Sequence, residues 1–282
     1  MDRRRLVRSA TALAALGLVR GSLAAGSGGG PGAAQVRGCE QPLYLTFDTG
    51  HMGVADLIAQ VLKRHGVQVT FFAANEATQQ GDGCLGEYWA PWWQARAGEG
   101  HEFASHTWDH MYWRADLRAR AGGPVTGFRV RPSAGPRANT SFAIDIAGYG
   151  EQITRAAQRL AQITGRKPLP LFRAPGGKTS PALLAAAREA GYAHVGWSPS
   201  GFLGDELPSE SHPNDKLLRQ ALENIRSGDI LLAHLGIWSR KSVWAQAVLE
   251  PLIVGLLDKG FCFRTLAQHP GYRDWIAQHR LS

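Results

Sequence analysis

Two histidines, His106 and His110, stand four residues apart directly after a short apolar run over 102–105. At this spacing two imidazoles lie on one face of a helical turn, and both can reach one metal ion. The run is a predicted strand, so the pair would lie at a strand's carboxyl end, where α/β barrels build their sites. The spacing also occurs in surface and capping roles, so its meaning depends on what gathers beside it.

Other reactive side chains stand at the ends of other predicted strands. Asp48 follows the first strand, Arg173 ends the fourth, Trp197 ends the fifth and His234 ends the sixth. The carboxyl ends of parallel barrel strands converge on one rim, so these residues would meet the histidine pair. A carboxylate, an arginine and three histidines would therefore meet at one rim, an alignment that scattered structural residues would rarely show.

Strand and helix patterns alternate along the chain. Repeated strand–helix units require parallel strands with right-handed crossovers, and both an open sheet and a closed barrel fit. A Gly-, Pro- and Arg-rich segment at about 114–148 is predicted as an insertion on the upper face with an irregular hairpin. The predicted strands are 43–47, 67–73, 102–105, 169–172, 192–197, 229–233 and 261–265; the predicted helices are 54–62, 88–98, 151–164, 180–190, 216–226 and 244–259.

The first 25 residues have the pattern of an export signal. Three arginines at 3–5 precede an apolar stretch over 9–19, which is shorter than the ~20 residues of a membrane helix, and small residues follow. The arginines also fit a twin-arginine signal, with an ordinary secretory signal or an uncleaved anchor as the alternatives. We therefore predict a periplasmic or extracellular protein with no stable membrane span after cleavage, a flexible linker over 26–40, and one catalytic domain over 41–282.

Charge and cysteine usage narrow the partners and the compartment. The net charge of +8 overstates that of the domain, because the first 24 residues hold five arginines and one aspartate. No basic patch interleaved with aromatic residues is present, so nucleic acid is not an expected partner. Cys39 precedes the first strand and Cys262 opens the last, so a disulfide between them is predicted, with buried free thiols as the alternative.

The ordered motifs resemble those of the polysaccharide deacetylases, the NodB-homology group of carbohydrate esterases (family 4). The resemblance runs from about 43 to 266, nearly the whole expected domain. It implies an α/β fold, a distorted (β/α)7 barrel. The matching segments are Thr46-Phe47-Asp48-Thr49-Gly50, the GHE…HxxxH stretch over 99–110, Arg173-Ala174-Pro175-Gly176-Gly177, Trp197 and Leu232-Ala233-His234.

The resemblance implies metal-assisted hydrolysis of an acetylated sugar. A divalent ion, usually zinc, would be held by His106, His110 and the residue at position 49, and it would polarise the acetyl carbonyl. Asp48 would be the general base, and Arg173 would keep Asp48 ionised and oriented.

The remaining motifs imply how the acetyl group is bound and released. The backbone N–H of Gly176 would help to stabilise the oxyanion, although the family usually has an aromatic residue at this position. His234 would be the general acid that protonates the leaving amine. Trp197 and Leu232 would form the wall of the acetyl pocket.

Two departures from the family pattern bear on this expectation. The family's third metal ligand is an aspartate where this chain has Thr49, and a hydroxyl is a poorer ligand than a carboxylate. Asp48 or His51 can take its place in principle, so three candidates for the third ligand remain open. We expect the His106–His110 site to be retained.

The second departure concerns the acid histidine. Ser200 stands where the family often has an aspartate that tunes this histidine, and Asp205 in the following loop is a candidate substitute for that aspartate. Neither assignment follows from the sequence.

The function expected from these residues is an exported metal-dependent hydrolase that removes N-acetyl groups from a polysaccharide, oligosaccharide or cell-wall sugar. Two alternatives remain. One is an inactive or weakly active polysaccharide-binding pseudo-enzyme, favoured by Thr49 and Ser200. The other is a related metal-free C–N hydrolase acting on a small amide. The polymer and the oligomeric state do not follow from the residues.

Overall fold

A computed structural model describes residues 38–280. The predicted export signal over 1–25 and nearly all of the 26–40 linker lie outside the described residues. In the part that is described, no helix has both the length and the apolar character needed to cross a membrane.

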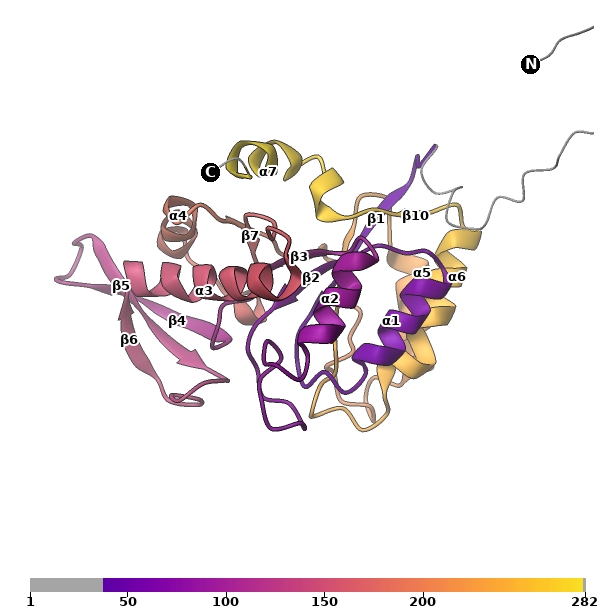
Figure 1. The fold of residues 1–282 in the computed structure, drawn as a ribbon, viewed down its shortest axis with the longest axis horizontal. Coiled ribbons are helices and arrows are strands. Elements are labelled where there is room, and N and C mark those ends of the chain that lie inside the picture. Colours follow the sequence, from indigo (N-terminus) through magenta and orange to yellow (C-terminus); the bar gives the residue numbers. More distant parts are fainter. Residues whose placement is uncertain (1–37, 281–282) are drawn as a thin grey trace, which may run out of the picture.

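A parallel sheet lies at the centre of the fold (Figure 1). The strand β1 pairs with β9 over Tyr44–Asp48, with β2 over Thr46–Asp48, and with β10 at its start. The order then continues through β3, β7 and β8. The seven strands in residues 38–280 are β1 (Pro42–Asp48), β2 (Thr70–Ala73), β3 (Glu102–Ser105), β7 (Leu171–Phe172), β8 (Ala193–His194), β9 (Ile230–His234) and β10 (Cys262–Phe263).

The sheet closes irregularly between β8 and β9. The segment after β8 runs along the free edge of β9, where Ser198 N–H donates to the Ile230 carbonyl and Leu203 N–H donates to the Leu232 carbonyl, both at 3.1 Å. Leu232 N–H in turn donates to the Gly201 carbonyl at 2.8 Å. The result is the distorted (β/α)7 barrel that was predicted.

Parallel register brings the carboxyl ends of the strands together. Asp48 at the end of β1 lies opposite His234 at the end of β9, and Ser105 at the end of β3 lies opposite Phe172 on β7. Side chains that follow these strands therefore share one rim of the barrel.

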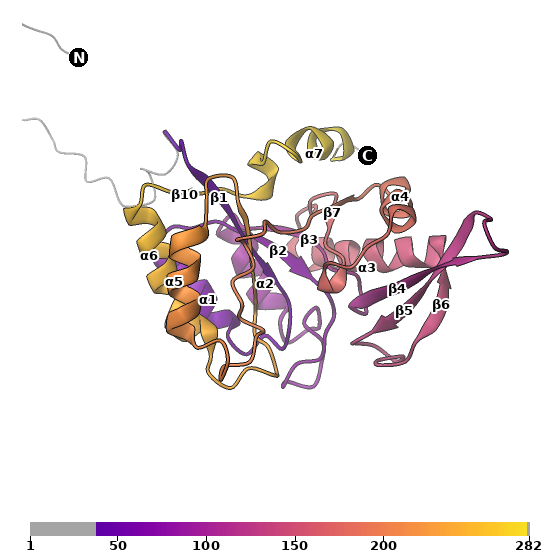
Figure 2. The same cartoon turned by 180° about the vertical axis from the view of Figure 1, so that it is seen from behind.

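Helices cover the outside of the barrel, with α1, α5 and α6 grouped on one flank in both views (Figures 1 and 2). Ser180 caps α4 as predicted, because its Oγ accepts a hydrogen bond from Leu183 N–H. The helix α7 was not predicted. The bounds are α1 (Ala55–Arg64), α2 (Ala90–Gly98), α3 (Ile146–Thr164), α4 (Pro181–Glu189), α5 (Asn214–Asn224), α6 (Glu250–Asp258) and α7 (Arg273–His279).

Two predicted helices differ in detail. The helix α3 begins earlier than expected because the Asp145 side chain accepts a hydrogen bond from Gly148 N–H and caps it there. The helix predicted over 244–259 is divided into a π-helical turn, Ala245–Leu249, and α6. Pro251 lies at the start of α6, where a proline's missing N–H interrupts the hydrogen-bond ladder.

The inserted segment is a sheet of its own and not the irregular hairpin that was predicted. Antiparallel strands β4 (Met111–Arg118), β5 (Val125–Pro132) and β6 (Phe142–Asp145) pair in sequence order. Figure 2 shows them beside α3 and α4, at the end of the molecule away from α5 and α6. Buried apolar residues of this sheet pack on α3, with the rings of Phe128 and Tyr149 5.5 Å apart. The inserted sheet therefore begins one residue after His110.

A disulfide joins Cys39 and Cys262, with 5.8 Å between their Cα atoms. It connects the chain just before β1 with β10, as predicted. Cys84 is buried and unpaired. The bridge therefore ties the start of the first barrel strand to the last one.

Candidate active site

Asp48 and Arg173 form a buried ion pair at the rim. One nitrogen of Arg173 (Nη1) donates to Asp48 Oδ1 at 2.7 Å and to Thr46 Oγ1 at 2.9 Å. The other guanidinium nitrogens donate to the carbonyls of Val195 and Gly196. The guanidinium is thus fixed in place, and removing it would leave a buried carboxylate without a counter-charge, which typically costs about 3–5 kcal/mol.

The same contact sets the charge of Asp48. Burial alone would raise the pKa of Asp48, but the adjacent Arg173 guanidinium outweighs burial and holds that pKa below its ordinary value. Asp48 is therefore a carboxylate at neutral pH and can accept a proton or bind a cation.

His106 and His110 meet as predicted, although the segment between them is a turn and not the helical turn that was expected. Thr107 and His110 have φ values of 63° and 50°, which break the helical repeat. The Thr107 hydroxyl accepts a hydrogen bond from Met111 N–H, where β4 begins. The turn nevertheless places the two Nε2 atoms 3.1 Å apart.

Both rings are oriented through Nδ1. Nδ1–H of His106 donates to the Arg173 carbonyl at 2.8 Å, which leaves a lone pair on Nε2. Nδ1 of His110 lies 2.5 Å from Ser133 Oγ and 3.5 Å from Glu76 Oε1. Burial lowers the pKa of His106 to about 4, so its ring is neutral at neutral pH. A neutral His106 ring whose Nε2 converges on Nε2 of His110 is suited to bind a divalent ion.

The third donor is less well defined. In residues 38–280, no group of three or more His, Cys, Asp or Glu side chains is already arranged to hold an ion. Two ligands of a tetrahedral zinc, each at about 2.0–2.1 Å, lie roughly 3.3 Å apart, close to the spacing of the two Nε2 atoms. The nearest carboxylates are Asp48, with Oδ2 3.4 Å from His106 Nε2, and Glu76. The histidine pair therefore fits two ligand positions, and among residues 38–280 no third His, Cys, Asp or Glu already completes the set.

The candidates for the third ligand lie in different surroundings. Thr49 is buried, and its hydroxyl donates to Glu76 Oε2 at 2.7 Å and accepts from Ala74 N–H at 3.1 Å. His51 is turned toward another loop, where Nδ1 accepts from Gly53 N–H and the ring lies 4.6 Å from that of Trp238.

Glu76 is a site residue that the sequence analysis missed. It lies three residues after β2, and β2 was a central strand whose carboxyl end had no candidate. A search for a polar residue after every barrel strand, and not only at matched motifs, would have found it.

His234 is paired with Asp205. Of the two residues considered as its partner, the loop residue Asp205 therefore contacts it and not Ser200. Backbone N–H of His234 donates to Asp205 Oδ2 at 2.7 Å, and its Nδ1 lies 3.0 Å from Oδ1. Burial alone would lower the pKa of His234, but the charge of Asp205 and this hydrogen bond outweigh burial and raise it to about 9. At neutral pH the ring is protonated and can donate a proton.

Tyr112 covers Gly176, and it too was missed. A Cβ atom on Gly176 would lie 2.9 Å from the Tyr112 ring, and that ring packs edge-on against His110 with 4.9 Å between centroids. Burial and the charge of Glu76 raise the pKa of Tyr112 to about 12, so its hydroxyl stays a donor. A ring on β4 thus takes the space left by the glycine.

Trp197 and Leu232 are the residues predicted to form the wall of the acetyl pocket. Trp197 packs over Gly177, since a Cβ atom there would lie 2.6 Å from the indole. Leu232 is buried on β9, two residues before His234.

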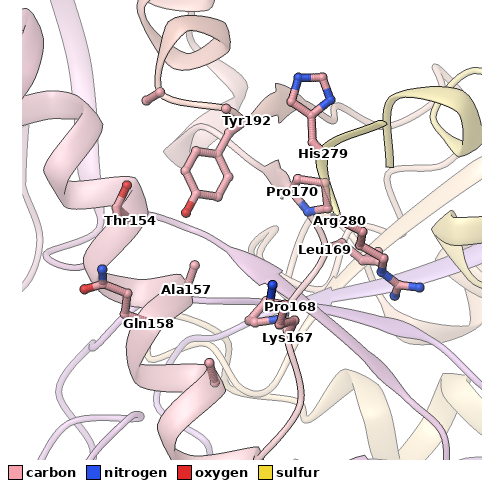
Figure 3. A pocket seen from close by; sticks show the side chains of 13 residues that line it. Thr154, Ala157, Gln158, Lys167, Pro168, Leu169, Pro170, Tyr192, His279 and Arg280 are labelled. Carbon is pink, nitrogen blue, oxygen red and sulfur yellow. The ribbon is translucent and has the colours of Figure 1, made fainter. Parts of the chain in front are cut away.

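A cavity of about 490 Å³ lies away from this rim (Figure 3). Its lining comes from α3, from the residues just before β7 and β8, and from the end of α7, with Tyr192 and His279 among them. It is therefore at the amino ends of the strands, opposite the polar rim, and is separate from the candidate site.

Comparison with known proteins gives the family. Residues 35–195, more than half of the chain, match the sequence profile described as polysaccharide deacetylase. The chain is 27% identical to the chitooligosaccharide deacetylase of Azorhizobium caulinodans, covering 83% of this chain and 97% of that one. It is 23% identical to the peptidoglycan-N-acetylglucosamine deacetylase of Bacillus cereus, covering 83% and 90%.

The fold has solved counterparts as well. The family 4 acetyl xylan esterase of Clostridium thermocellum, solved with a cobalt ion, superposes with a TM-score of 0.60 at 18% identity, covering 83% of this chain and 92% of that one. At this identity the likeness concerns the fold alone. The sequence match is the stronger finding, and it shows that this chain belongs to the polysaccharide deacetylase family.

Proposed function

We propose that this protein is an exported, metal-dependent deacetylase that removes N-acetyl groups from a polysaccharide or cell-wall sugar. The observation that carries the proposal is the meeting, at one rim, of an ionised carboxylate, a convergent histidine pair and a protonated histidine. The ionised Asp48, the neutral His106 and the protonated His234 have the protonation states that amide hydrolysis requires of them.

His106 and His110 would hold the metal through their Nε2 atoms, which lie 3.1 Å apart. A divalent ion such as zinc supplies Lewis acidity toward the acetyl carbonyl and lowers the pKa of bound water. The Nδ1–H of His106 stays on the Arg173 carbonyl, so this ring keeps the tautomer that a ligand needs.

Asp48 would take the proton from the attacking water. Its carboxylate is ionised and is held in one orientation by Arg173. A fixed base needs no reorganisation when the water attacks, and general base catalysis of this kind typically contributes about 10²- to 10⁴-fold.

The acetyl group would lie between the motif after β7 and the end of β9. The backbone N–H of Gly176 would donate to the developing oxyanion, and Trp197 and Leu232 would exclude water around the methyl group. Tyr112, which covers Gly176, would contact the sugar ring.

His234 would complete the reaction by protonating the leaving nitrogen. The C–N bond breaks as the new C–O bond is kept, and the products are acetate and a free amine. Asp205 keeps His234 protonated until that step.

The substrate class and the location rest on separate support. The relatives above are named as deacetylases of chitooligosaccharide and of peptidoglycan N-acetylglucosamine, which supports an N-acetylated sugar as the substrate. The amino-terminal export pattern and the Cys39–Cys262 disulfide support an oxidising compartment outside the cytosol.

The test of the activity is acetate release from N-acetylated chitin oligosaccharides and peptidoglycan by the zinc-loaded protein. We expect Asp48→Asn to lower kcat by at least about 100-fold, because the base is lost while the shape is kept. Asp56→Asn, on the exposed face of α1, is the matched control and should retain full activity. Equal acetate release by the wild type and Asp48→Asn would contradict the proposal.

Thr49 favours a second candidate, a polysaccharide-binding protein without turnover, since a hydroxyl stands at the family's ligand position. That candidate predicts binding of the polymer without acetate release. It also predicts that Thr49→Asp gains activity over an inert wild type.

A further inference from the structure

The carboxylate of Glu76 lies beside the residue that lacks one. We propose that Glu76 is the third protein ligand of the metal and replaces the acidic side chain absent from position 49. The inference rests on the proposed function only in assuming that a divalent ion binds at the histidine pair.

The contacts of Glu76 place its two oxygens between Thr49 and the second histidine. Oε2 accepts the Thr49 hydroxyl at 2.7 Å, and Oε1 lies 3.5 Å from His110 Nδ1. The side chain is 18% exposed, so it is neither locked in the core nor free in solvent. Its charge acts on His106 as well. Oε1 faces Nδ1 of His110, on the other side of the ring from Nε2, so Glu76 would reach an ion held by both Nε2 atoms by turning its side chain toward that side.

The other candidates are committed elsewhere. Thr49 uses its hydroxyl proton on Glu76 and accepts from Ala74 N–H, so it holds a carboxylate and does not substitute for one. Oδ1 of Asp48 is bound by Arg173, while Oδ2 lies 3.4 Å from His106 Nε2, so Asp48 can face the ion as a base without leaving its ion pair. His51 contacts Gly53 through Nδ1.

The backbone around Glu76 is tied to the histidine segment. Asn75 N–H donates to the Trp108 carbonyl at 2.8 Å, inside the turn that carries both histidines. The Glu76 carbonyl accepts from Cys84 N–H at 2.8 Å, which closes the following loop. The proposed ligand therefore comes from a backbone that is fixed to the other two ligands.

Side-chain length explains how the position can change. Glu76 follows β2 and reaches across to the end of β1, where its Oε2 accepts the hydroxyl of Thr49. A glutamate is one methylene longer than an aspartate, so it can reach this point from the neighbouring strand. Carboxylate with two imidazoles is a ligand set found in catalytic zinc sites.

The experiment measures metal binding without substrate. Zinc affinity of the chelator-stripped full-length protein is determined by competition with a chromogenic chelator, and the visible spectrum of the Co²⁺ form reports the ligand set. We expect Glu76→Gln to weaken zinc binding by more than 100-fold and to change the Co²⁺ bands. Asp48→Asn should change affinity by less than tenfold.

The matched control is Ser133→Ala, because Ser133 also contacts Nδ1 of His110. Loss of an outer partner typically costs about 10- to 100-fold in metal affinity and leaves the ligands in place, so the Co²⁺ bands should be unchanged. The double variant Thr49→Asp with Glu76→Gln should regain both affinity and a three-ligand spectrum.

Two results overturn the inference. One is a Glu76→Gln protein whose zinc affinity and Co²⁺ spectrum match those of the wild type or of Ser133→Ala. The other is a large loss in Asp48→Asn with none in Glu76→Gln. A protein that binds zinc through Glu76 but releases no acetate would contradict the proposed function and leave the ligand assignment standing.

Discussion

The charges of Asp48 and His234 in the candidate site each depend on a partner from another part of the chain. Asp48 is ionised because Arg173, from the segment after β7, faces it. His234 is protonated because Asp205, from the loop before α5, faces it. A change in a partner should therefore alter the chemistry while the reactive group stays in place.

Asp205→Asn should move the alkaline limit of activity to lower pH. A general acid works only while protonated, so activity falls as the pH rises through the His234 pKa of about 9. Without the Asp205 charge, burial dominates and the pKa falls, while the charges of Asp48 and Glu206 offset only part of the change. The measurement is the pH profile of kcat/KM.

Glu206→Gln, at the exposed neighbouring carboxylate, is the control and should shift the alkaline limit much less. An unchanged profile in Asp205→Asn would exclude His234 as the acid.

Tyr112→Ala should weaken substrate binding more than catalysis. The ring covers Gly176 and packs against His110, so its loss removes one wall of the acetyl site. An aromatic contact is worth about 0.5–1.5 kcal/mol, which corresponds to a rise in KM of about 2- to 10-fold. Tyr112→Phe keeps the ring and should keep KM. Steady-state kinetics separates the two, and a fall in kcat alone would show that the ring does not bind sugar.

At the scale of elements, the inserted sheet and the helix α4 support the loop that carries Gly176. Ser180 caps α4 and also donates from its hydroxyl to Asp116 Oδ1 on β4 at 2.6 Å. One side chain thus joins a barrel helix to the inserted sheet, next to the segment that would hold the acetyl group.

Ser180→Ala should destabilise the protein by about 1 kcal/mol, within the 0.5–2 kcal/mol typical of a lost N-cap. The Leu183 N–H loses its acceptor, and Asp116 loses a donor. Urea unfolding gives the difference in free energy. Ser180→Thr retains a hydroxyl and should stay within a few tenths of a kcal/mol of the wild type. Equal stability of all three proteins would show that solvent replaces the cap.

The sequence predicted those parts of the fold that leave a local pattern. Apolar runs and ordered motifs located the barrel strands, and Asp48 lies where the motif put it. The inserted sheet lacked a continuous apolar run because exposed and partly buried residues interrupt its strands, as in β6 with its alternating exposure. Glu76 and Tyr112 were not found because their roles depend on contacts made in space. Glu76 approaches Thr49 and Tyr112 approaches Gly176, and the sequence around Glu76 or Tyr112 does not reveal either contact.

At the scale of the whole molecule, the disulfide is the contact that joins the most distant segments of the barrel. The two cysteines are 223 residues apart, so the bridge restricts the unfolded chain strongly. It also holds β10 against the start of β1, where the two strands share only the pairs from Pro42 to Leu43.

The double variant Cys39→Ser with Cys262→Ser should lose about 2–5 kcal/mol of stability, the usual effect of removing a native disulfide. The measurement is denaturant unfolding of both proteins with and without a thiol reductant. The wild type should fall to the level of the variant on reduction, whereas the variant should not respond. If full reduction of the disulfide left the free energy of unfolding of the wild type unchanged, a stabilising role would be contradicted.

Closed by its disulfide, the chain from Cys39 to Cys262 is a covalent ring. The turn between β4 and β5 carries the exposed Arg120, so it offers a cleavage site to trypsin-like proteases. A single cut there would open the ring without releasing a fragment, because the bridge and the barrel strands still join the two pieces. Such a nicked protein would migrate as one chain until the disulfide is reduced. The cut would interrupt the chain between β4 and β5, while the residues of the rim on either side of the cut stay attached to the barrel.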